Sequence, residues 1–528
     1  MEGLELVVVI GATLVFGGAI AGRIRVPTSL VLLVLGAVLG FIPFLGDVEL
    51  EPEVVLLLFL PALLYWESLN TSLREIKRNL RVILLQGVVL VMITAGIVAW
   101  VGQALGLPWP IALALGAILA PTDATAVAAV AGRLPRRALT TLRAESLIND
   151  GTALVIYAIA VGAAVSGTAI DLGGAALQFT ASYAFGILIG LAVAAVIIVV
   201  RRIVTERLVA STLSVLTPFL AYLPAEAFGV SGVVAVVVCG LTLSWFAPQI
   251  ITASQRSQSF GFWQVATYIL NGALFVLIGF EFHHIVDDLG VGWATTIGAG
   301  LLISVVVVGT RLAWANTTPY VIRLVDRRPK QRALRVGWRQ RFPLAWAGFR
   351  GAVSLAAALA LPTQTAAGEP LPGREFVIAI TFIVILFTLL VQGLTMPAIV
   401  RWAKLPPDPT ELDEELLAEQ AGLRAALVEL PAAAARVQAS PEIVDHLRAV
   451  YEERLGNIHR ESDDPAEAYR EESDFDTKAR LQLELLPAKR EALLALRNAG
   501  KIDDVILRRV QARIDLEELR LSDAEEDE

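Results

Sequence analysis

The feature that most constrains this chain is a succession of long apolar runs between its N-terminus and residue 404. A helix needs roughly 20 mainly apolar residues to cross the hydrocarbon core of a bilayer, and about 13 segments meet that length. Hydrophobic residues make up 56% of the chain, more than a water-soluble fold can readily bury. We therefore predict an all-α membrane protein with transmembrane helices at 3–22, 27–45, 53–72, 82–104, 109–132, 140–166, 175–200, 208–226, 229–248, 260–282, 291–320, 343–362 and 375–402.

The charges between these runs predict the orientation of the chain in the membrane. Every second connection is basic and the others are acidic or neutral, with Arg374 as the exception. Because basic loops stay on the cytoplasmic side, this alternation predicts an odd number of spans, an N-terminus outside and a cytoplasmic C-terminus. The basic positions are Arg23, Arg25, Arg74, Lys77, Arg78, Arg81, Arg133, Arg136, Arg137, Arg143, Arg201, Arg202, Arg207, Arg256 and several within 323–341.

The last part of the chain, residues 405–528, differs in composition from the apolar domain at 1–404. Three prolines at 406, 407 and 409 should end the last span, since proline cannot continue a helix. Beyond them, leucines and alanines recur at helical spacing among charged residues, which predicts several amphipathic helices over 411–521. We interpret 405–528 as a cytoplasmic helical tail for stability or dimer contacts, with a regulatory role as the alternative.

Charged side chains inside the apolar runs are the candidate functional residues, since a charge within a membrane is costly. The densest group runs from Glu145 to Asp150, in the span predicted at 140–166. Helical spacing puts Ser146 and Asp150 on one stripe, and Glu145 and Asn149 on the next. A carboxylate beside a hydroxyl is a hard oxygen site that suits a small cation, and the carboxylate can take a proton instead. The alternative is a buried ion pair that only ties helices together.

The span predicted at 109–132 is interrupted midway by Pro121, Thr122 and Asp123. Proline removes a backbone hydrogen bond and clashes with the preceding turn, so we expect the helix to break here. Broken helices at the midplane are where transporters expose carbonyl groups and helix ends to ions. Thr122 and Asp123 are therefore candidate ligands, and a simple proline kink is the alternative.

An arginine at comparable depth, Arg350, lies in the span predicted at 343–362. A buried guanidinium needs an anionic partner, and we expect Glu145 to be that partner, which leaves Asp150 for the transported ion. The spans predicted at 109–132 and 343–362 are seven apart in the order of the spans, an arrangement that suits an inverted repeat.

Three other residues inside the predicted spans are less decisive. Glu67 either faces the ion site or lies near the inner membrane interface beside Trp66. Arg311 either pairs within the helix bundle or extends its charged end towards the interface. Cys239, the single cysteine, lies within an apolar run, and we interpret it as a packing residue.

Motifs that the sequence lacks argue against several functional classes. It contains no phosphate-binding P-loop, so we do not expect ATP hydrolysis to drive transport. It has no potassium-channel filter, arginine ladder, Cys/His metal cluster or nucleophile elbow. We therefore expect no enzymatic activity and no cofactor apart from the ions that the protein would carry.

Five longer motifs occur in order along the apolar domain, at 59–67, 121–127, 145–153, 349–355 and 386–395. Together they resemble the monovalent cation:proton antiporter-1 family, the sodium/proton exchangers, in its bacterial branch. The run Glu-Ser-Leu-Ile-Asn-Asp-Gly at 145–151 is the most specific of the five. At 124–125 this chain has Ala-Thr after the acid, where many relatives carry Pro-Val or Ala-Val.

The resemblance implies a homodimer in which each protomer has an ion-carrying core domain and a dimerisation domain, with two broken helices that cross in the core. It implies that Asp150 exchanges the cation and the proton. Ser146, Thr122 and Glu67 would help Asp150 to coordinate Na⁺. Asp123 matches the family's acid in the first broken helix and is a further candidate for cation or proton binding.

The resemblance also implies residues that organise the site without carrying the ion. Asn149 and Glu145 would do so together with Arg350. The pair Asn149–Asp150, in place of two aspartates, is similar to the electroneutral class that exchanges one cation for one proton. The implied function is a Na⁺ (or Li⁺)/H⁺ antiporter that works by movement of its core domain and serves pH homeostasis.

Other functions remain open on the sequence. One is a K⁺/H⁺ or broad monovalent cation/H⁺ antiporter, because ligand types alone do not fix the radius of the ion. Another is a gated cation channel, and a third is a membrane sensor that transports nothing and signals through the tail at 411–528. The absence of disulfides and the bacterial type of the motifs predict a location in the bacterial inner (plasma) membrane.

Overall fold

The computed structural model describes residues 2–24, 26–42, 52–124, 127, 134–204, 206–280, 282–283, 292–325, 337–405, 409–463 and parts of 481–518. The chain divides into two compact units, Met1–Pro407 and Asp408–Glu528. Within the described ranges the chain is helical apart from its connecting segments and one antiparallel bridge between Gln364 and Pro370. Parts of the predicted spans 27–45, 109–132, 260–282 and 291–320, and the predicted stop at 406–408, lie outside the described residues.

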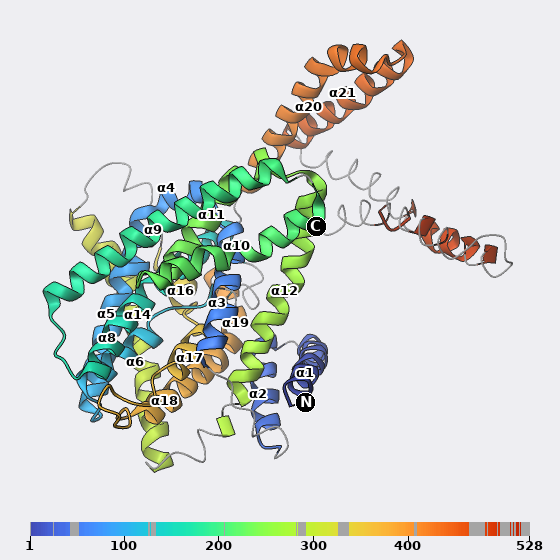
Figure 1. Cartoon of the computed structure of the whole chain (residues 1–528). Coiled ribbons are helices and arrows are strands. Elements are labelled where there is room, and N and C mark those ends of the chain that lie inside the picture. Colours follow the sequence, from blue (N-terminus) through green and yellow to red (C-terminus); the bar gives the residue numbers. More distant parts are fainter. Residues whose placement is uncertain are drawn as a thin grey trace. The chain divides into compact units, whose positions relative to one another are not determined.

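The first unit is a bundle of helices in the order that the apolar runs predict (Figure 1). Every predicted span overlaps a described helix, and the helices of the fourth and last spans each include a π-helical turn, η1 and η2. The elements are α1 (Glu2–Ile24), α2 (Thr28–Gly40), α3 (Pro52–Leu69), α4 (Leu73–Leu84), η1 (Leu85–Leu90), α5 (Val91–Ala104), α6 (Trp109–Leu119), α8 (Arg136–Ser166), α9 (Leu172–Ile203), α10 (Arg207–Ala227), α11 (Gly232–Ile250), α12 (Ala253–Phe280), α14 (Trp293–Val325), α16 (Trp338–Trp346), α17 (Ala352–Leu359), α18 (Arg374–Phe387), η2 (Thr388–Gly393) and α19 (Leu394–Ala403).

The lengths and surfaces of these helices are those of a multi-pass membrane protein. Among the described residues, nine continuous helices are long and apolar enough to cross a bilayer, and α2, α6 and part of α3 are shorter apolar helices. Large apolar side chains face outward, as do Val196 and Val199 on α9, which are 60% and 58% exposed. Such a surface needs a lipid solvent, so the predicted all-α membrane fold is confirmed.

Two apolar cores hold the bundle together. The larger one includes side chains from α5, α6, α14, α17 and α18, and the smaller one joins α3, α9, α10 and α11. Close backbone contact adds to this packing where α2 meets α12. A Cβ atom at Gly279 would lie 2.1 Å from the Leu33 carbonyl oxygen, and one at Gly36 would lie 2.2 Å from the Val276 carbonyl oxygen. Glycine at these positions lets the two helices approach as closely as membrane helices do.

The exception to the charge pattern of the loops, Arg374, has a structural explanation at the first turn of α18. Its Nε donates to the Leu361 carbonyl at 2.9 Å, and its Nη2 donates to the Leu359 carbonyl at 3.1 Å. These carbonyls lie at the C-terminal end of α17, where the helix leaves acceptors without partners. Arg374 therefore caps α17, and its charge balances the partial negative charge of that helix end.

The second unit begins with two helices, α20 (Pro409–Val437) and α21 (Pro441–Asp463), that lie against each other. Arg454 of α21 donates from Nε to Glu419 of α20 at 2.8 Å. Both side chains are partly exposed, so this ion pair contributes at most about 1 kcal/mol to the hairpin. The remainder of the tail predicted at 411–521 is described only in part.

Candidate functional site

Two interrupted helices meet inside the first unit. The helix α6 ends at Leu119, ahead of Pro121, and the chain is non-helical through Asp123. A second interruption separates α16 from α17 at residues 347–351. The two non-helical segments touch, since the Asp123 amide donates to the Phe349 carbonyl at 2.8 Å. The predicted break at Pro121 is confirmed, and so is the crossing of the two broken helices.

The helix ends at this crossing are matched by opposite charges. Arg350 is 1% exposed, and its Nε donates to the Leu119 carbonyl at the end of α6 at 2.9 Å. Its Nη1 also donates to the Gly348 carbonyl, just beyond α16. One guanidinium therefore donates hydrogen bonds at the C-terminal ends of two half-helices, and its charge balances the partial negative charge there.

The Asp123 carboxylate lies at the opposite kind of helix end. A Cβ atom built on Gly351, the residue before α17, would lie 2.2 Å from Asp123 Oδ2. The carboxylate thus rests against the positive N-terminus of α17, which stabilises a negative charge there. Glycine at 351 is what allows this close approach.

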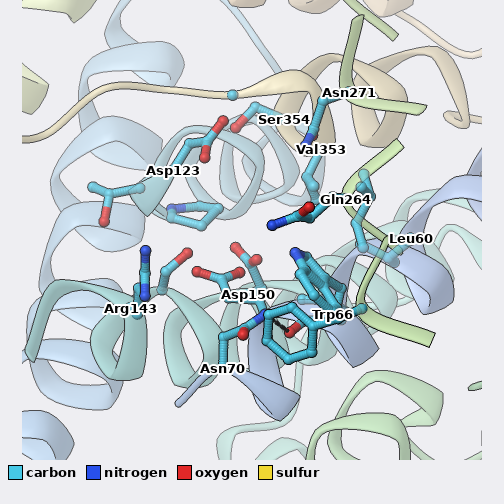
Figure 2. Close-up of a pocket in the computed structure, with 18 residues that line it drawn as sticks. Leu60, Trp66, Asn70, Asp123, Arg143, Asp150, Gln264, Asn271, Val353 and Ser354 are labelled. Carbon is cyan, nitrogen blue, oxygen red and sulfur yellow. Dashed lines mark hydrogen bonds between the residues drawn. The ribbon is translucent and has the colours of Figure 1, made fainter. Parts of the chain in front are cut away.

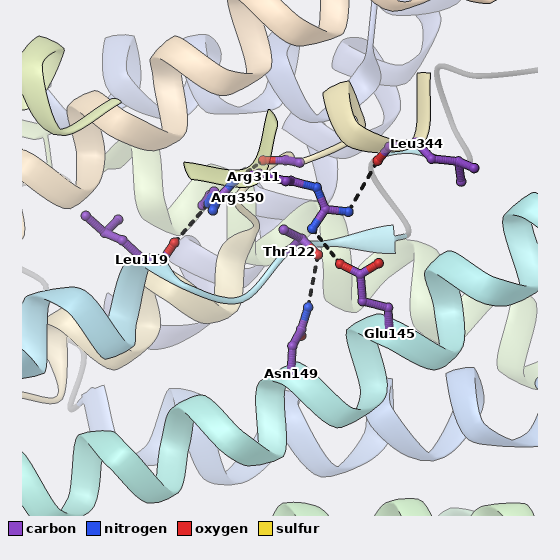
Figure 3. Close-up of polar contacts among 8 residues, drawn as sticks. Leu119, Thr122, Glu145, Asn149, Arg311, Leu344 and Arg350 are labelled. Carbon is purple, nitrogen blue, oxygen red and sulfur yellow. Dashed lines mark hydrogen bonds and ion pairs between the residues drawn. The ribbon is translucent and has the colours of Figure 1, made fainter. Parts of the chain in front are cut away.

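The buried salt bridge near the crossing is not the predicted one. Arg311, from α14, donates from Nη1 to Glu145 Oε1 of α8 at 2.5 Å (Figure 3). Its Nη2 also donates to the Leu344 carbonyl of α16 at 3.3 Å. The expectation that Glu145 pairs with Arg350 was wrong, because Glu145 points to α14 and Arg350 is engaged by backbone carbonyls. Arg311 pairs within the bundle, which was one of its two interpretations.

The stripe of α8 that carries Glu145 also holds the first broken helix in place. Asn149 donates from Nδ2 to Thr122 Oγ1 at 3.0 Å (Figure 3). Both residues are buried, at 1% and 6% exposure. The hydroxyl of Thr122 accepts this bond, so its proton and remaining lone pair stay available to other partners.

The neighbouring stripe of α8 faces a cavity of about 420 Å³ (Figure 2). Arg143, Ser146 and Asp150 lie along it, one helical turn apart. Thr122, Asp123 and Glu67 line the same space, so the structure brings all five predicted cation-binding residues to one cavity. The predicted organising residues Asn149, Glu145 and Arg350 lie outside its wall.

Glu67 reaches the cavity from α3, and the neighbouring Trp66 lines the same space. Its Oε1 is buried and has no hydrogen-bond partner among the described residues. Asp150 is 7% exposed and forms no ion pair with the residues that the structure describes. Two carboxylates that form no ion pair with the described residues thus face the cavity from different helices.

Five polar residues of the cavity wall were not among the predicted site residues, and one of them, Asn70, lies just after α3. Gln264 and Asn271 come from α12 and Ser354 from α17, and Arg143 precedes Ser146 on α8. Gln264 and Asn271 could have been recognised from sequence, since two amides seven residues apart in an apolar span share one face of the helix. Their amide groups offer neutral oxygen ligands opposite the carboxylates.

A second, much smaller cavity lies beyond Asp150. It has a volume of about 10 Å³ and is lined by Asp150, Tyr157 and Ser354, among other residues. That space is about what one water molecule needs. Asp150 therefore lines both the wide cavity and the narrow one.

The ligand types at the wide cavity favour a small, hard cation. Carboxylate, hydroxyl and amide oxygens suit such ions, whereas transition metals favour imidazole and thiolate. In the described ranges no group of three or more His, Cys, Asp and Glu residues could hold a metal ion. The oxygen ligands of the cavity therefore suit a small, hard cation or a proton.

Comparisons with known proteins match this chain to sodium/hydrogen exchangers and related antiporters. The family described as "Sodium/hydrogen exchanger, transmembrane" matches residues 11–402. An "Uncharacterized Na(+)/H(+) exchanger" of Mycobacterium tuberculosis is 46% identical over 528 residues, or 99% of this chain and 96% of the relative. A "Sodium, potassium, lithium and rubidium/H(+) antiporter" of Bacillus pumilus is 31% identical over 70% of this chain and 57% of its own length.

The fold also has a solved counterpart. The structure of the sodium proton antiporter MjNhaP1 from Methanocaldococcus jannaschii matches with a TM-score of 0.60. The match covers 77% of this chain and 100% of the other, at 19% sequence identity. At that identity the likeness concerns the fold of the helices alone.

Proposed function

Because the chain belongs to the sodium/hydrogen exchanger family, we propose that it exchanges Na⁺ or Li⁺ for H⁺ across the membrane, with both ions competing for Asp150. The observation that carries this proposal is the contrast between Asp150 and the two other acids at the crossing, Glu145 and Asp123. Glu145 is paired with Arg311, and Asp123 lies at a helix N-terminus. Asp150 faces the cavity with no ion-pair partner among the described residues, so its charge is left for a transported ion.

The oxygen atoms around Asp150 supply the rest of the coordination. Ser146 lies one turn before Asp150 on the same face of α8, and Thr122 is held by Asn149. Glu67 completes the set from α3, and water fills the remaining positions. Asp123 adds negative charge to the cavity, which raises the local concentration of cations.

A shared carboxylate explains how the two ion flows are coupled. With Na⁺ or H⁺ bound, Asp150 carries no net charge, and the core can cross the membrane interior. With neither ion bound, the buried negative charge makes that movement costly. Asn149 beside Asp150 leaves one titrating carboxylate on this stretch of α8, so one Na⁺ exchanges for one H⁺ and the cycle is electroneutral.

The two cavities at Asp150 correspond to the two sides of the membrane. The wide cavity includes Asn70 and Arg143, which lie beside the end of α3 and near the start of α8, where the basic connections gather. With basic connections in the cytoplasm, the wide cavity opens inward and the narrow one marks the closed outward route. We place the protein as a homodimer in the bacterial inner membrane, with the tail unit in the cytoplasm.

A broader cation selectivity is the second candidate. The relative from Bacillus pumilus is named for sodium, potassium, lithium and rubidium, and it is 31% identical to this chain. Oxygen ligands bind all of these ions, and a cavity of about 420 Å³ does not enforce a single radius.

Proton flux in proteoliposomes tests both candidates. An acid lumen is prepared, and Na⁺, Li⁺ or K⁺ is added outside to vesicles with wild type or Asp150→Asn. We expect Na⁺ and Li⁺ to alkalinise the lumen in wild type, K⁺ to have no effect, and the variant to be inactive. An equal response to K⁺ would select the broad antiporter, and an active Asp150→Asn protein would overturn the proposed mechanism.

A clamp of the membrane potential tests the stoichiometry in the same vesicles. An electroneutral exchanger should run at the same rate at zero and at a large imposed potential, because no net charge crosses. A rate that changes with potential would contradict the one-for-one exchange.

A further inference from the structure

A positively charged residue, Arg143, lines the cavity at which we propose that a cation binds. Arg143, near the start of α8, lines the same space as Asp150, Asp123 and Glu67 (Figure 2). It interacts electrostatically with Glu67, yet it forms no hydrogen bond or ion pair with the residues that the structure describes. Arg143 is partly exposed, so water can satisfy its donors without a protein partner. Its position therefore places a fixed positive charge beside the three acids of the cavity.

Three acidic residues line the cavity together with Arg143. Glu67 comes from α3, Asp123 from the break after α6, and Asp150 from α8 itself. The walls from α12 and α17 contribute neutral groups, Gln264, Asn271 and Ser354 among them. Of the lining residues that the structure describes, Arg143 alone is positive, so it opposes the field that three acids create.

We propose that Arg143 is an affinity-setting residue, whose fixed charge weakens the binding of Na⁺ and of H⁺ at Asp150 by the same factor. The inference rests on the proposed function, in which both ions bind that carboxylate. Both carry one positive charge to the same place, so Arg143 repels them equally. The consequence is faster release of the bound ion into the wide cavity, at the expense of affinity.

The size of the effect follows from the geometry of α8. Arg143 and Asp150 are seven residues apart, which is roughly 10 Å along a helix. Two unit charges at that distance change a dissociation constant roughly 2-fold in water and roughly 17-fold at an effective dielectric constant of 20. The half-exposed position of Arg143 lies between these limits.

Competition between the ions gives this proposal a distinctive signature. At alkaline pH few protons compete, and the apparent KM for Na⁺ follows the dissociation constant of Na⁺ alone. At acidic pH the apparent KM for Na⁺ depends on the dissociation constant of Na⁺ divided by that of H⁺. If both constants change by the same factor, this ratio stays the same. Neutralising Arg143 should therefore lower KM at alkaline pH and leave it unchanged at acidic pH. A steric or packing role would not separate the two pH ranges in this way.

The test measures the apparent KM for Na⁺ in proteoliposomes at both pH extremes. We expect Arg143→Gln to lower the alkaline KM roughly 2- to 17-fold, with no change at acidic pH. Arg143→Glu should lower the alkaline KM by about the square of that factor, and Arg143→Lys should restore the wild-type values. The matched control is Arg78→Gln, which removes the same charge from an exposed position on α4, outside the cavity.

The outcomes separate this inference from the function on which it rests. An alkaline KM that stays constant or rises in Arg143→Gln, or one that falls equally at both pH values, would overturn the role of Arg143. A wild-type KM that does not rise with proton concentration would instead overturn competition at Asp150. If one of the variants Arg143→Gln, Arg143→Glu and Arg143→Lys fails to fold, the KM values of the other two still test the effect of charge at this position.

Discussion

Removing one partner of the salt bridge between Glu145 and Arg311 is expected to cost more stability than removing one partner of a surface ion pair. Glu145 Oε1 and Arg311 Nη1 are 2.5 Å apart, and the two side chains are 2% and 6% exposed. Removing one partner leaves an uncompensated charge in a dry interior, which costs about 3–5 kcal/mol. Replacing both partners by neutral groups removes that penalty. We therefore expect Glu145→Gln and Arg311→Met to be strongly destabilised singly, and the double variant to recover most of the loss.

The assay is the apparent melting temperature of the protein purified in detergent, measured for wild type, both single variants and the double variant. The matched control combines Glu145→Gln with Arg350→Met. Arg350 donates to the carbonyls of Leu119 and Gly348 and not to Glu145, so this pair should show no rescue. A double Glu145/Arg311 variant no more stable than the weaker single variant would refute the reasoning. Rescue of Glu145→Gln by Arg350→Met would refute it as well.

Three further substitutions test how the crossing is held. Gly351→Ala should reduce the exchange rate severely, since its Cβ would lie 2.2 Å from Asp123 Oδ2 and such overpacking costs about 1–3 kcal/mol. Asn149→Ala should raise the KM for Na⁺ roughly 2- to 13-fold, because the 3.0 Å bond that positions Thr122 is worth about 0.5–1.5 kcal/mol. Arg374→Met should lower the melting temperature and leave the KM for Na⁺ unchanged, since it uncaps α17 away from the cavity.

Each of these substitutions has a result that counts against the structure. A Gly351→Ala protein with wild-type exchange would mean that Asp123 does not rest against the start of α17. Unaltered Na⁺ affinity in Asn149→Ala would remove Thr122 from the ligand set or Asn149 from its support. A shift of KM in Arg374→Met, with stability preserved, would assign Arg374 to the ion path and not to the cap.

The sequence was most informative where local chemistry alone determines the structure. Proline lacks an amide proton and clashes with the turn before it, which favours the break near Pro121. Pro61 and Pro218 lie inside the continuous helices α3 and α10, so proline alone does not decide where a helix breaks. The apolar runs predicted the helices because a membrane demands about 20 apolar residues per span. Likewise, Ser146 and Asp150 share a face because helical spacing requires it.

The sequence was least informative about which helices face each other. Arg350 and Glu145 were expected to pair because both lie at mid-membrane depth, but depth leaves the direction around the helix axis open. Arg311 lies on a third helix, α14, and points to Glu145. The role of Arg350 as a partner of two helix ends could not be predicted either, since it depends on where the two broken helices cross.

The central claim is that Na⁺ and H⁺ exclude each other at Asp150. Proton release on addition of Na⁺ to purified protein in weakly buffered detergent solution tests this most directly, because it needs neither a gradient nor movement of the core. We expect release of up to one proton per protomer from the wild type, at a pH where the site is protonated, and none from Asp150→Asn. Equal release from Asp150→Asn would contradict it, as would Na⁺ binding to the wild type without proton release at that pH.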